Sequence, residues 1–371
     1  MYLKNIKLTN FRNYNKLTVS FNKGINIIYG DNAQGKTNLL ESIYVLGITK
    51  SHRNINEISL INYNKNYFFI KGRLKRDKFY TDLEVYADDS KKILKKDSDI
   101  IKKVSDYISA MNIIIFTPDD LDIIKSSPQI RRKFLDTELA QLYSDYYVVN
   151  NDYKKLLKMR NDYLKKILKG NNLDKVYLDT LTSILIDKSI IIYKMRRKFL
   201  DKINIYCNSI FKDIMQRDGF KIVYKCSCDI NLDSSNLKEE LLKKYKDKYD
   251  IDLKLSSTSI GPHKDDFEFY LDDLNIKLYG SQGQQRVAVL TLKLSEIEIF
   301  RNYKNNTPIL LLDDIFSEID NEKKINLIKY IKKDIQTIIT TTDLNNIDDK
   351  TLESAKIFKI QNGKITREVI K

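Results

Sequence analysis

The residues with the clearest chemistry form a run of eight, Gly30 to Thr37, which reads G-x-x-x-x-G-K-T and matches the P-loop pattern. In such a loop, backbone N–H groups and the start of the following helix surround phosphate oxygens. Lys36 is expected to reach the β- and γ-phosphates of a nucleotide, and the Thr37 hydroxyl to bind Mg²⁺. The predicted nucleotide-binding residues are Gly30, Asp31, Asn32, Ala33, Gln34, Gly35, Lys36 and Thr37.

A pair of carboxylates could complete the metal side of this site. Asp313 and Asp314 follow the apolar run Ile309-Leu310-Leu311-Leu312, which is typical of a buried strand. A P-loop needs a carboxylate on a parallel neighbouring strand to hold the Mg²⁺ shell. We therefore predict Asp313 as the metal-side residue and Asp314 as the group that polarises the attacking water. The alternative is a buried strand that merely ends in two solvent-facing aspartates.

A third segment, Gly280-Ser281-Gln282-Gly283-Gln284-Gln285-Arg286, opens a predicted helix near 287–300. A small hydroxyl residue, a glycine and a helix start are together suited to an anion. The chain contains only one P-loop motif. A second phosphate-binding helix start therefore indicates that the site is completed by another subunit.

The elements around the P-loop are those that the motif requires. Residues 25–29 form a short β-branched run, as in a buried strand, and residues 38–46 place apolar side chains at helical spacing. The alternative, a glycine turn before an ordinary helix, is disfavoured by these flanks. Downstream, Ser51-His52-Arg53 has two equally weighted interpretations: a polar loop, or a cation and a hydrogen-bonding ring beside the nucleotide.

The remaining pattern predicts an α/β lobe interrupted by a helical one. Strands are expected within 1–29, 66–87 and 112–116, and a charged, solvated run at 90–99. Helices are expected near 128–148, 151–169 and 174–215, the last with room for one break. The C-terminal third adds strands at 309–312 and 337–340, a helix at 323–333 and a hairpin around Asn362-Gly363. The predicted domains are a head lobe from 1–116 and 256–371 and an inserted, mostly helical arm lobe at 117–255.

The composition narrows the function classes. The 371 residues include 65 basic and 50 acidic side chains, net +15, which favours a polyanionic partner, although drift towards A/T-rich codons is an alternative cause. Three cysteines, an odd and sparse set, predict a reducing compartment without a disulfide framework or zinc site. There is no signal-peptide pattern and no apolar run of membrane-spanning length. We expect a cytoplasmic protein.

Taken in order, these motifs resemble the ABC-type ATPase heads of the SMC/Rad50/RecF group, and within that group the RecF branch. The resemblance rests on the P-loop, on the S-Q-G-Q-Q segment and on D-D-I-F-S-E-I-D. It spans nearly the whole chain through further matching segments, namely Leu8–Tyr14, Lys50–Arg53, Phe116–Leu121, Arg131–Asp136 and Gly261–Asp266.

The resemblance implies an ABC-type P-loop head with an inserted arm, with ATP and Mg²⁺ as cofactors. It implies an ATP-dependent homodimer in which Ser281, Gly283 and Gln284 cap, in trans, the γ-phosphate that Lys36 of the other subunit holds. It also implies binding to duplex DNA and to single-strand/double-strand junctions. With RecR- and RecO-type mediator proteins, the chain would direct recombinase loading in DNA repair, replication restart and the SOS response.

Several positions depart from transporter ATPases, which belong to the same superfamily. Asp314 stands where those proteins usually carry Glu, and because a shorter acid reaches less far, this predicts slow hydrolysis. The expected enzyme is a weak, DNA-dependent ATPase whose principal role is DNA binding. The switch His is replaced by Thr340-Thr341-Thr342-Asp343, and no Q-loop glutamine is evident near Phe116. Lys36 and Ser281 lie 245 positions apart, which predicts a compact head rather than a long coiled coil. The alternatives are the ATPase subunit of a membrane transporter and a non-hydrolysing DNA binder; the missing His, the basic charge and the arm favour the repair ATPase.

Overall fold

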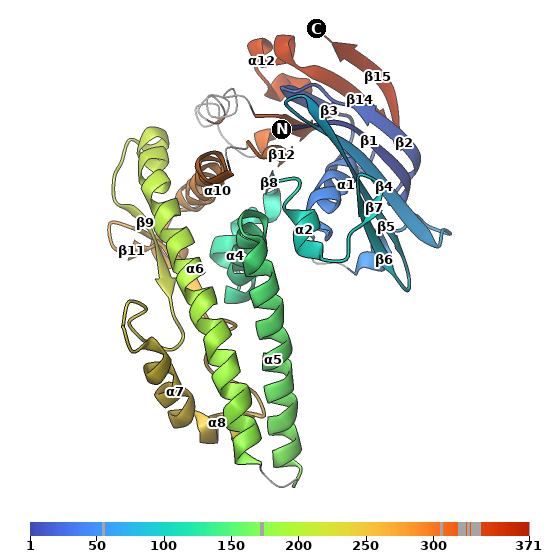
Figure 1. The fold of residues 1–371 in the computed structure, drawn as a ribbon. Coiled ribbons are helices and arrows are strands. Elements are labelled where there is room, and N and C mark those ends of the chain that lie inside the picture. Colours follow the sequence, from blue (N-terminus) through green and yellow to red (C-terminus); the bar gives the residue numbers. More distant parts are fainter. Residues whose placement is uncertain are drawn as a thin grey trace. The chain divides into compact units, whose positions relative to one another are not determined.

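The computed structural model describes residues 1–53, 56–170, 174–304, 307–317, 324, 327 and 335–370. These divide into two compact units, shown as a ribbon in Figure 1. Unit 1 combines residues 1–120 with 293–371, and unit 2 is the continuous segment 121–292. We describe each unit by itself.

Unit 1 contains a six-stranded antiparallel sheet near its N-terminus, with strand order β2-β1-β4-β5-β6-β7. Its strands alternate between core and solvent, so that Leu83, Val85 and Ala87 of β5 are buried while the residues between them are partly exposed. The strands are β1 Tyr2–Phe11, β2 Tyr14–Ser20, β4 Tyr67–Arg76, β5 Phe79–Asp88, β6 Lys92–Lys96 and β7 Asp99–Ile100. The run 90–99, expected as a solvated segment, thus contributes β6 and the start of β7.

A second six-stranded sheet carries the P-loop and has the order β15-β14-β3-β13-β12-β8. All neighbours in it are parallel except β14 and β15, which form the predicted C-terminal hairpin. Its strands are β3 Ile25–Tyr29, β8 Ile113–Phe116, β12 Ile309–Asp313, β13 Thr337–Thr341, β14 Lys356–Gln361 and β15 Lys364–Ile370.

The strand order corrects one prediction. We expected the strand before Asp313 to be the immediate neighbour of the P-loop strand. Instead β13 lies between β3 and β12 and pairs in parallel with both. β12 and β13 are equally buried, as expected of strands in a sheet covered on both faces, so their apolar character does not determine which of them lies next to β3.

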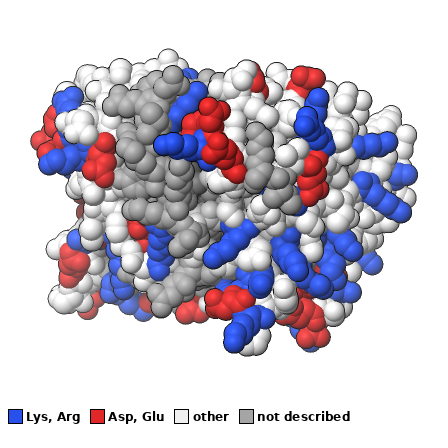
Figure 2. Space-filling view, turned by 90° about the horizontal axis from the view of Figure 1, so that it is seen from above, with Lys and Arg blue, Asp and Glu red and all other residues white. Residues whose placement is uncertain are grey.

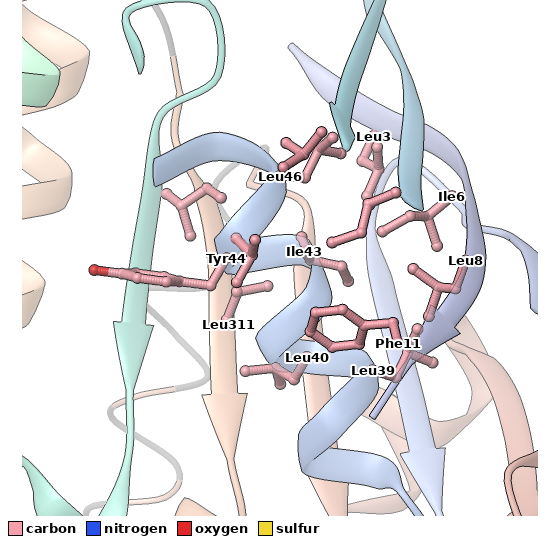
Figure 3. Close-up of a cluster of buried hydrophobic side chains, with 14 of the residues drawn as sticks. Leu3, Ile6, Leu8, Phe11, Leu39, Leu40, Ile43, Tyr44, Leu46 and Leu311 are labelled. Atoms are coloured by element: carbon pink, nitrogen blue, oxygen red, sulfur yellow. The ribbon is translucent and has the colours of Figure 1, made fainter. Parts of the chain in front are cut away.

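The core of unit 1 is built around helix α1, Lys36–Ile48, which carries apolar side chains on several faces. In Figure 3, Leu39, Ile43 and Leu46 point towards residues of β1, while Leu311 of β12 lies on another side of the helix. This burial fixes the helix, and therefore the P-loop at its start, against both sheets. The shorter elements of unit 1 are η1 Glu57–Leu60, α2 Val104–Ile108, η3 Ile315–Ser317, η4 Leu344–Asn346 and α12 Asp349–Ser354.

Unit 2 is mostly helical, as predicted for the arm. Its longest helix, α6 Lys175–Met215, has 41 residues and no break, and it packs against α5, Ser144–Leu168. Unit 2 also contains a three-stranded sheet of order β11-β10-β9, whose strand β9 packs against α6 and whose strand β10 packs against α4 and α9. The short helix η2 Pro118–Leu121 lies at the boundary between the two units. The other elements of unit 2 are α3 Asp122–Lys125, α4 Pro128–Leu142, β9 Phe220–Lys225, α7 Leu237–Asp247, α8 Tyr249–Leu255, β10 Asp266–Leu271, β11 Leu274–Asn275 and α9 Ile276–Tyr279.

The second boundary of the arm differs from the predicted one. The arm was expected to end at 255, but β10 pairs along its whole length with β9, so residues 256–292 pack within unit 2. Helix α10, Gln282–Lys304, then carries the chain across the boundary between the units. Of the helix predicted at 323–333, the structure describes only residues 324 and 327, both of which are helical. Among the described helices, none combines the length and apolar character needed to cross a bilayer.

Buried ion pairs tie the elements of unit 2 together. Arg160 donates hydrogen bonds to Asp252 at 2.8 Å and to Thr182 at 3.0 Å, which links α5 to α8 and α6. The side chains of Arg160 and Asp252 are 2% and 0% exposed. Because a buried charge without a partner is costly, this pair restricts how the helices can pack.

Candidate nucleotide-binding site

The P-loop adopts a conformation that its two glycines make accessible. Gly30 has φ +154° and Gly35 has φ +109°, values that side-chain-bearing residues rarely adopt. A Cβ on Gly30 would lie 2.3 Å from the Ile360 carbonyl oxygen, and one on Gly35 would lie 2.5 Å from the Asn13 side chain. The loop is therefore closely packed by neighbouring segments as well as turned by its own glycines.

Contacts from distant parts of the chain hold the outer side of the loop. The Tyr14 hydroxyl donates to the Gly35 carbonyl oxygen at 2.8 Å. On the other side, the Asn362 N–H donates to Gln34 Oε1 at 2.6 Å, and the Gly363 N–H donates to the Gln34 carbonyl oxygen at 3.1 Å. Gln34 thus binds the C-terminal hairpin. Sequence reasoning missed these anchors, because each pairs residues far apart in the chain.

Lys36 occupies the inner side of the loop. Its Nζ donates to the carbonyl oxygens of Gly30 at 2.6 Å and Asp31 at 2.8 Å. Burial lowers the pKa of the Lys36 ammonium, and the carboxylates of Asp314, Asp313 and Asp31 oppose that shift. The surrounding negative groups thus favour a charged ammonium, the form that can bind phosphate oxygens.

The end of β12 meets the start of α1 at the predicted metal-side residue. Asp313 Oδ1 accepts hydrogen bonds from the Thr37 hydroxyl at 2.9 Å and from the Thr340 hydroxyl at 2.7 Å. Burial raises the pKa of Asp313, and the hydrogen bonds from Thr340 and Thr37 oppose the rise. Thr340 lies opposite Asp313 in the sheet register, so the inserted strand β13 supplies a hydrogen-bond donor that sequence reasoning did not assign.

Asp314 lies just beyond the strand, in a left-handed backbone conformation with φ 51°. Its N–H donates to the Thr340 carbonyl oxygen at 3.2 Å and hydroxyl oxygen at 3.0 Å. Two residues of the same β-strand end are thereby anchored on Thr340. An aspartate is among the few residue types that adopt positive φ readily, so this position suits its identity.

These side chains surround a cavity of about 330 Å³, within the size range of ligand sites. Its lining includes Lys36, Thr37, Asp313 and Asp314, which the sequence analysis assigned to one site. It also includes Thr340, to which the sequence analysis assigned no role in the site. Gly30, Asp31 and Gln34, also predicted, do not line the cavity and act instead through the loop contacts described above. The full lining is Asn32, Ala33, Gly35, Lys36, Thr37, Asn38, Arg53, Asp313, Asp314 and Thr340.

Segment 51–53 was predicted to be either a polar loop or a source of a cation and a ring beside the nucleotide, and its residues differ in this respect. Arg53 lines the cavity, as the nucleotide-site interpretation predicted. His52 instead packs edge-on against Tyr44, with ring centroids 5.5 Å apart. The Ser51 hydroxyl donates to the buried Glu41 carboxylate, which Arg12 also binds at 2.9 Å. Glu41 of α1 therefore positions the loop that places Arg53 at the cavity.

Ser281, Gly283 and Gln284 belong to unit 2, at the start of α10. The Ser281 N–H donates to Gln284 Oε1 at 2.8 Å, and the Gln284 N–H donates to Ser281 Oγ at 3.2 Å. This reciprocal pattern is a capping box, which satisfies backbone donors of the first helical turn. Ser281, Gln282 and Gly283 are exposed. The first turn of α10 is thus both preorganised and accessible.

Known proteins identify the lineage of this arrangement. The family model described as the RecF/RecN/SMC N terminal domain matches residues 2–366. The chain belongs to the RecF family. It is 38% identical over 372 residues to the DNA replication and repair protein RecF of Bacillus cereus (strain AH820) and equally to that of Bacillus thuringiensis (strain Al Hakam), covering 100% of this chain and 99% of each relative.

Solved structures agree with this membership. A structure of the recombination mediator protein RecF with ATP has a TM-score of 0.92 at 32% identity, covering 99% of this chain and 97% of its own. A second, with ATPrS, has a TM-score of 0.91 at the same identity, covering 99% and 98%. An Smc head, at 15% identity and TM-score 0.55 with 100% and 97% covered, shares the fold. The predicted family and ABC-type head fold are confirmed, and the transporter alternative is not favoured.

Proposed function

We propose that the chain binds ATP with Mg²⁺ at this cavity and that ATP joins two copies into a dimer that holds DNA. The observation that carries the proposal is the convergence on one cavity of Lys36 and Thr37, from the start of α1, and Asp313, from the distant strand β12. Lys36 and the loop N–H groups bind the phosphates. Arg53 adds a second cation on the cavity wall.

The residues present fit a magnesium ion. The Thr37 hydroxyl and the Asp313 carboxylate are oxygen ligands 2.9 Å apart, and Mg²⁺ typically takes one or two protein oxygens together with phosphates and water. When bound, the ion neutralises charge on the phosphates. Asp314, at the cavity wall, orients and polarises the attacking water. Its short side chain reaches less far than Glu, so we propose weak hydrolysis. Because the proposed dimer forms on DNA, we propose that the hydrolysis is also DNA-dependent.

The second copy supplies the cap. A glycine in the first turn of a helix lowers helix stability, yet a Cβ on Gly283 would meet only Ser281 Oγ, at 3.9 Å. Packing within the described chain therefore does not explain why this position is a glycine. A phosphate or another backbone that approaches this position closely would explain it, because glycine has no side chain in the way. Ser281, Gly283 and Gln284 accordingly act on the nucleotide that the partner copy holds.

The polyanionic partner is DNA, at single-strand/double-strand junctions or in duplex form. The net charge of +15 supports this, and so does the repair role in the names of the relatives. On the face in Figure 2, acidic groups are interspersed among basic side chains, which gather towards the right. RecR- and RecO-type mediator proteins are the proposed protein partners, since a solved relative is described as part of the RecFOR pathway. The proposed location is the cytoplasm, without membrane attachment.

The test is complementation between two inactive variants, followed by sedimentation with ATP and gapped DNA. Lys36→Ala disables the P-loop and Ser281→Arg disables the cap, so neither variant alone should dimerise. In an equimolar mixture, one composite site pairs an intact Lys36 with an intact Ser281, and heterodimers should form. A wild-type protein that stays monomeric with ATP and gapped DNA would refute the shared-site mechanism.

A further inference from the structure

The solvent-facing side of the first sheet carries basic residues in rows across β4 and β5. In two rows the charge is neutralised locally. Lys71 Nζ lies 2.7 Å from Glu84 Oε1, and the Arg73 guanidinium donates to both oxygens of Asp82, at 2.6 and 2.8 Å. These pairs join residues that lie directly opposite one another in the strand register.

The row at the end of the sheet is different. Lys75 lies opposite Tyr80, and its Nζ is 5.7 Å from the Tyr80 ring centroid. Lys4 lies at an irregularity of β1, between the paired residues Leu3 and Asn5, and its Nζ is 5.0 Å from the same centroid. In the part of the chain that the structure describes, no carboxylate forms an ion pair with Lys4 or Lys75.

The turn between β4 and β5 adds exposed charge. Lys78 is exposed in that turn, and Tyr80 beside it is 47% exposed. We refer to Lys4, Lys75, Lys78 and Tyr80 as the tip cluster. All four belong to unit 1, and β4 and β5 are drawn as a long hairpin in Figure 1.

Fold stability does not account for this grouping. Two ammonium groups directed at one exposed ring repel each other, whereas the neighbouring rows show that a carboxylate opposite each cation is readily built into this face. A polyanion would relieve the repulsion by exchanging the ring for phosphate oxygens. That exchange would uncover the face of Tyr80, and an exposed aromatic ring between cations is the arrangement on which single-stranded nucleic acid stacks.

We propose that the tip cluster is a nucleic-acid contact surface that prefers a duplex end or gap. The lysines bind phosphates, and Tyr80 stacks on an unpaired base. A base inside a duplex has both faces covered by its neighbours, so the Tyr80 ring can stack only on an unpaired or terminal base. The inference rests on the proposed DNA-binding function and assigns one surface to it.

The lysines are tested by the salt dependence of binding, measured by fluorescence anisotropy on gapped DNA between about 50 and 200 mM salt. Each lost phosphate contact lowers the slope of log K against log salt by about 0.7 to 0.9. The Lys4→Gln/Lys75→Gln double variant should therefore lose about 1.4 to 1.8 units of slope. A charge-matched control, Lys359→Gln/Lys16→Gln, removes two exposed strand lysines elsewhere in unit 1 and should change the slope less.

A second control removes a neutralised pair from the same face. Arg73→Gln/Asp82→Asn keeps the net charge and should leave the slope unchanged. Tyr80 is tested separately: Tyr80→Leu should reduce the preference for gapped over fully duplex DNA by about five- to tenfold, and Tyr80→Phe should keep it. Salt slope and Tyr80 effects are independent readouts, and none of these variants changes a residue that lines the nucleotide cavity.

The outcomes separate this inference from the proposed function. Wild-type protein that does not bind DNA refutes the proposed function. Wild-type binding that the tip variants change no more than the matched controls do refutes the tip cluster alone. If the tip variants lost binding to acidic phospholipid vesicles but kept wild-type DNA binding, the cluster would be assigned to a membrane surface and the inference would be overturned.

Discussion

The Thr37 hydroxyl donates a hydrogen bond of 2.9 Å to Asp313 Oδ1, although 276 positions separate the two residues in the sequence. The contact joins the first turn of α1 to the end of β12. Strand β13 lies between β12 and the P-loop strand β3 in the sheet. The hydrogen bond holds the two proposed magnesium ligands close together within the protein itself. Their positions therefore depend on the order of strands in the sheet as well as on the P-loop.

Replacing Asp313 by Asn separates metal binding from stability. Burial raises the pKa of Asp313, which means that the buried carboxylate is disfavoured, so a neutral amide of similar shape should leave thermal stability unchanged or slightly raised. We expect the variant to bind ATP equally with and without Mg²⁺, measured by calorimetry. A metal effect on affinity as large as in the wild type would contradict the assignment of Asp313.

Asp314→Asn should abolish hydrolysis while preserving ATP-dependent dimerisation. Asn also adopts positive φ readily, so the backbone at this position should not change. The measurements are steady-state phosphate release and sedimentation with ATP. Phosphate release at the wild-type rate would exclude Asp314 as the group that polarises water.

Gly283→Ala tests the cap without disturbing the fold. Alanine is the better helix former by up to about 1 kcal/mol, and space around Gly283 is open, so the melting temperature should hold or rise. ATP-dependent dimerisation should nevertheless be lost, because the added methyl group lies on the surface that approaches the partner's nucleotide. Gly24→Ala is the matched control, since a Cβ there meets nothing within 4 Å. Equal dimerisation by both variants would refute the close approach.

Arg160→Met should destabilise unit 2 by about 3–5 kcal/mol, because it leaves Asp252 buried without its cation. Adding Asp252→Leu should recover part of the loss, since the uncompensated charge is then gone. Urea unfolding monitored by hydrogen exchange in α5 and α6 gives the energies. A double variant less stable than the single one would show that Asp252 is stabilised by its other contacts, such as the Ser259 N–H at 2.8 Å.

His263 should give unit 2 an acid-dependent stability. Burial lowers the pKa of His263 from 6.5 to about 4, and the ring is held between the Tyr153 hydroxyl at 2.6 Å and the Thr258 carbonyl oxygen at 2.9 Å. Between those two values the unfolded chain binds a proton that the folded chain does not. Stability should therefore be full above pH 6.5 and fall by up to about 3 kcal/mol as the pH drops to 4.

The control for this pH effect is His263→Gln, which cannot titrate. The variant will be less stable overall, but its unfolding free energy should vary less between pH 6.5 and 4 than that of the wild type. Identical pH profiles would show that the titration of other groups, such as buried carboxylates, dominates in this range.

Local patterns predicted the local parts of this molecule. Strand, P-loop and helix follow one another within residues 25–48, and the hairpin turn at Asn362-Gly363 has both residues at positive φ, as this dipeptide favours. Each of these elements is specified by contiguous residues. The unbroken helix α6 likewise follows from apolar residues at three- and four-residue spacing.

The order of parallel strands was beyond such patterns. Buried strands β12 and β13 have equivalent apolar character, so nothing local distinguishes the central from the flanking position. The contribution of Thr340 to the site depends on that order. The sequence of β6 predicts a solvated run because three of its five residues are lysines, and in the structure only Leu94 is buried. Charge on a strand near a sheet edge protects against unwanted pairing, and its pattern resembles that of a loop.

The continuous segment 121–292 interrupts unit 1, and this has a consequence during synthesis. Domains generally fold as units while the chain is made, so unit 2 can fold as soon as it has left the ribosome. The P-loop, by contrast, is made early and must wait for β12 and β13, which emerge last but for the C-terminal hairpin. A chain released before residue 337 contains Lys36 and Thr37 but lacks Thr340. Without β13, strands β3 and β12 have no strand between them to pair with. Nucleotide binding would therefore distinguish finished chains from truncated ones.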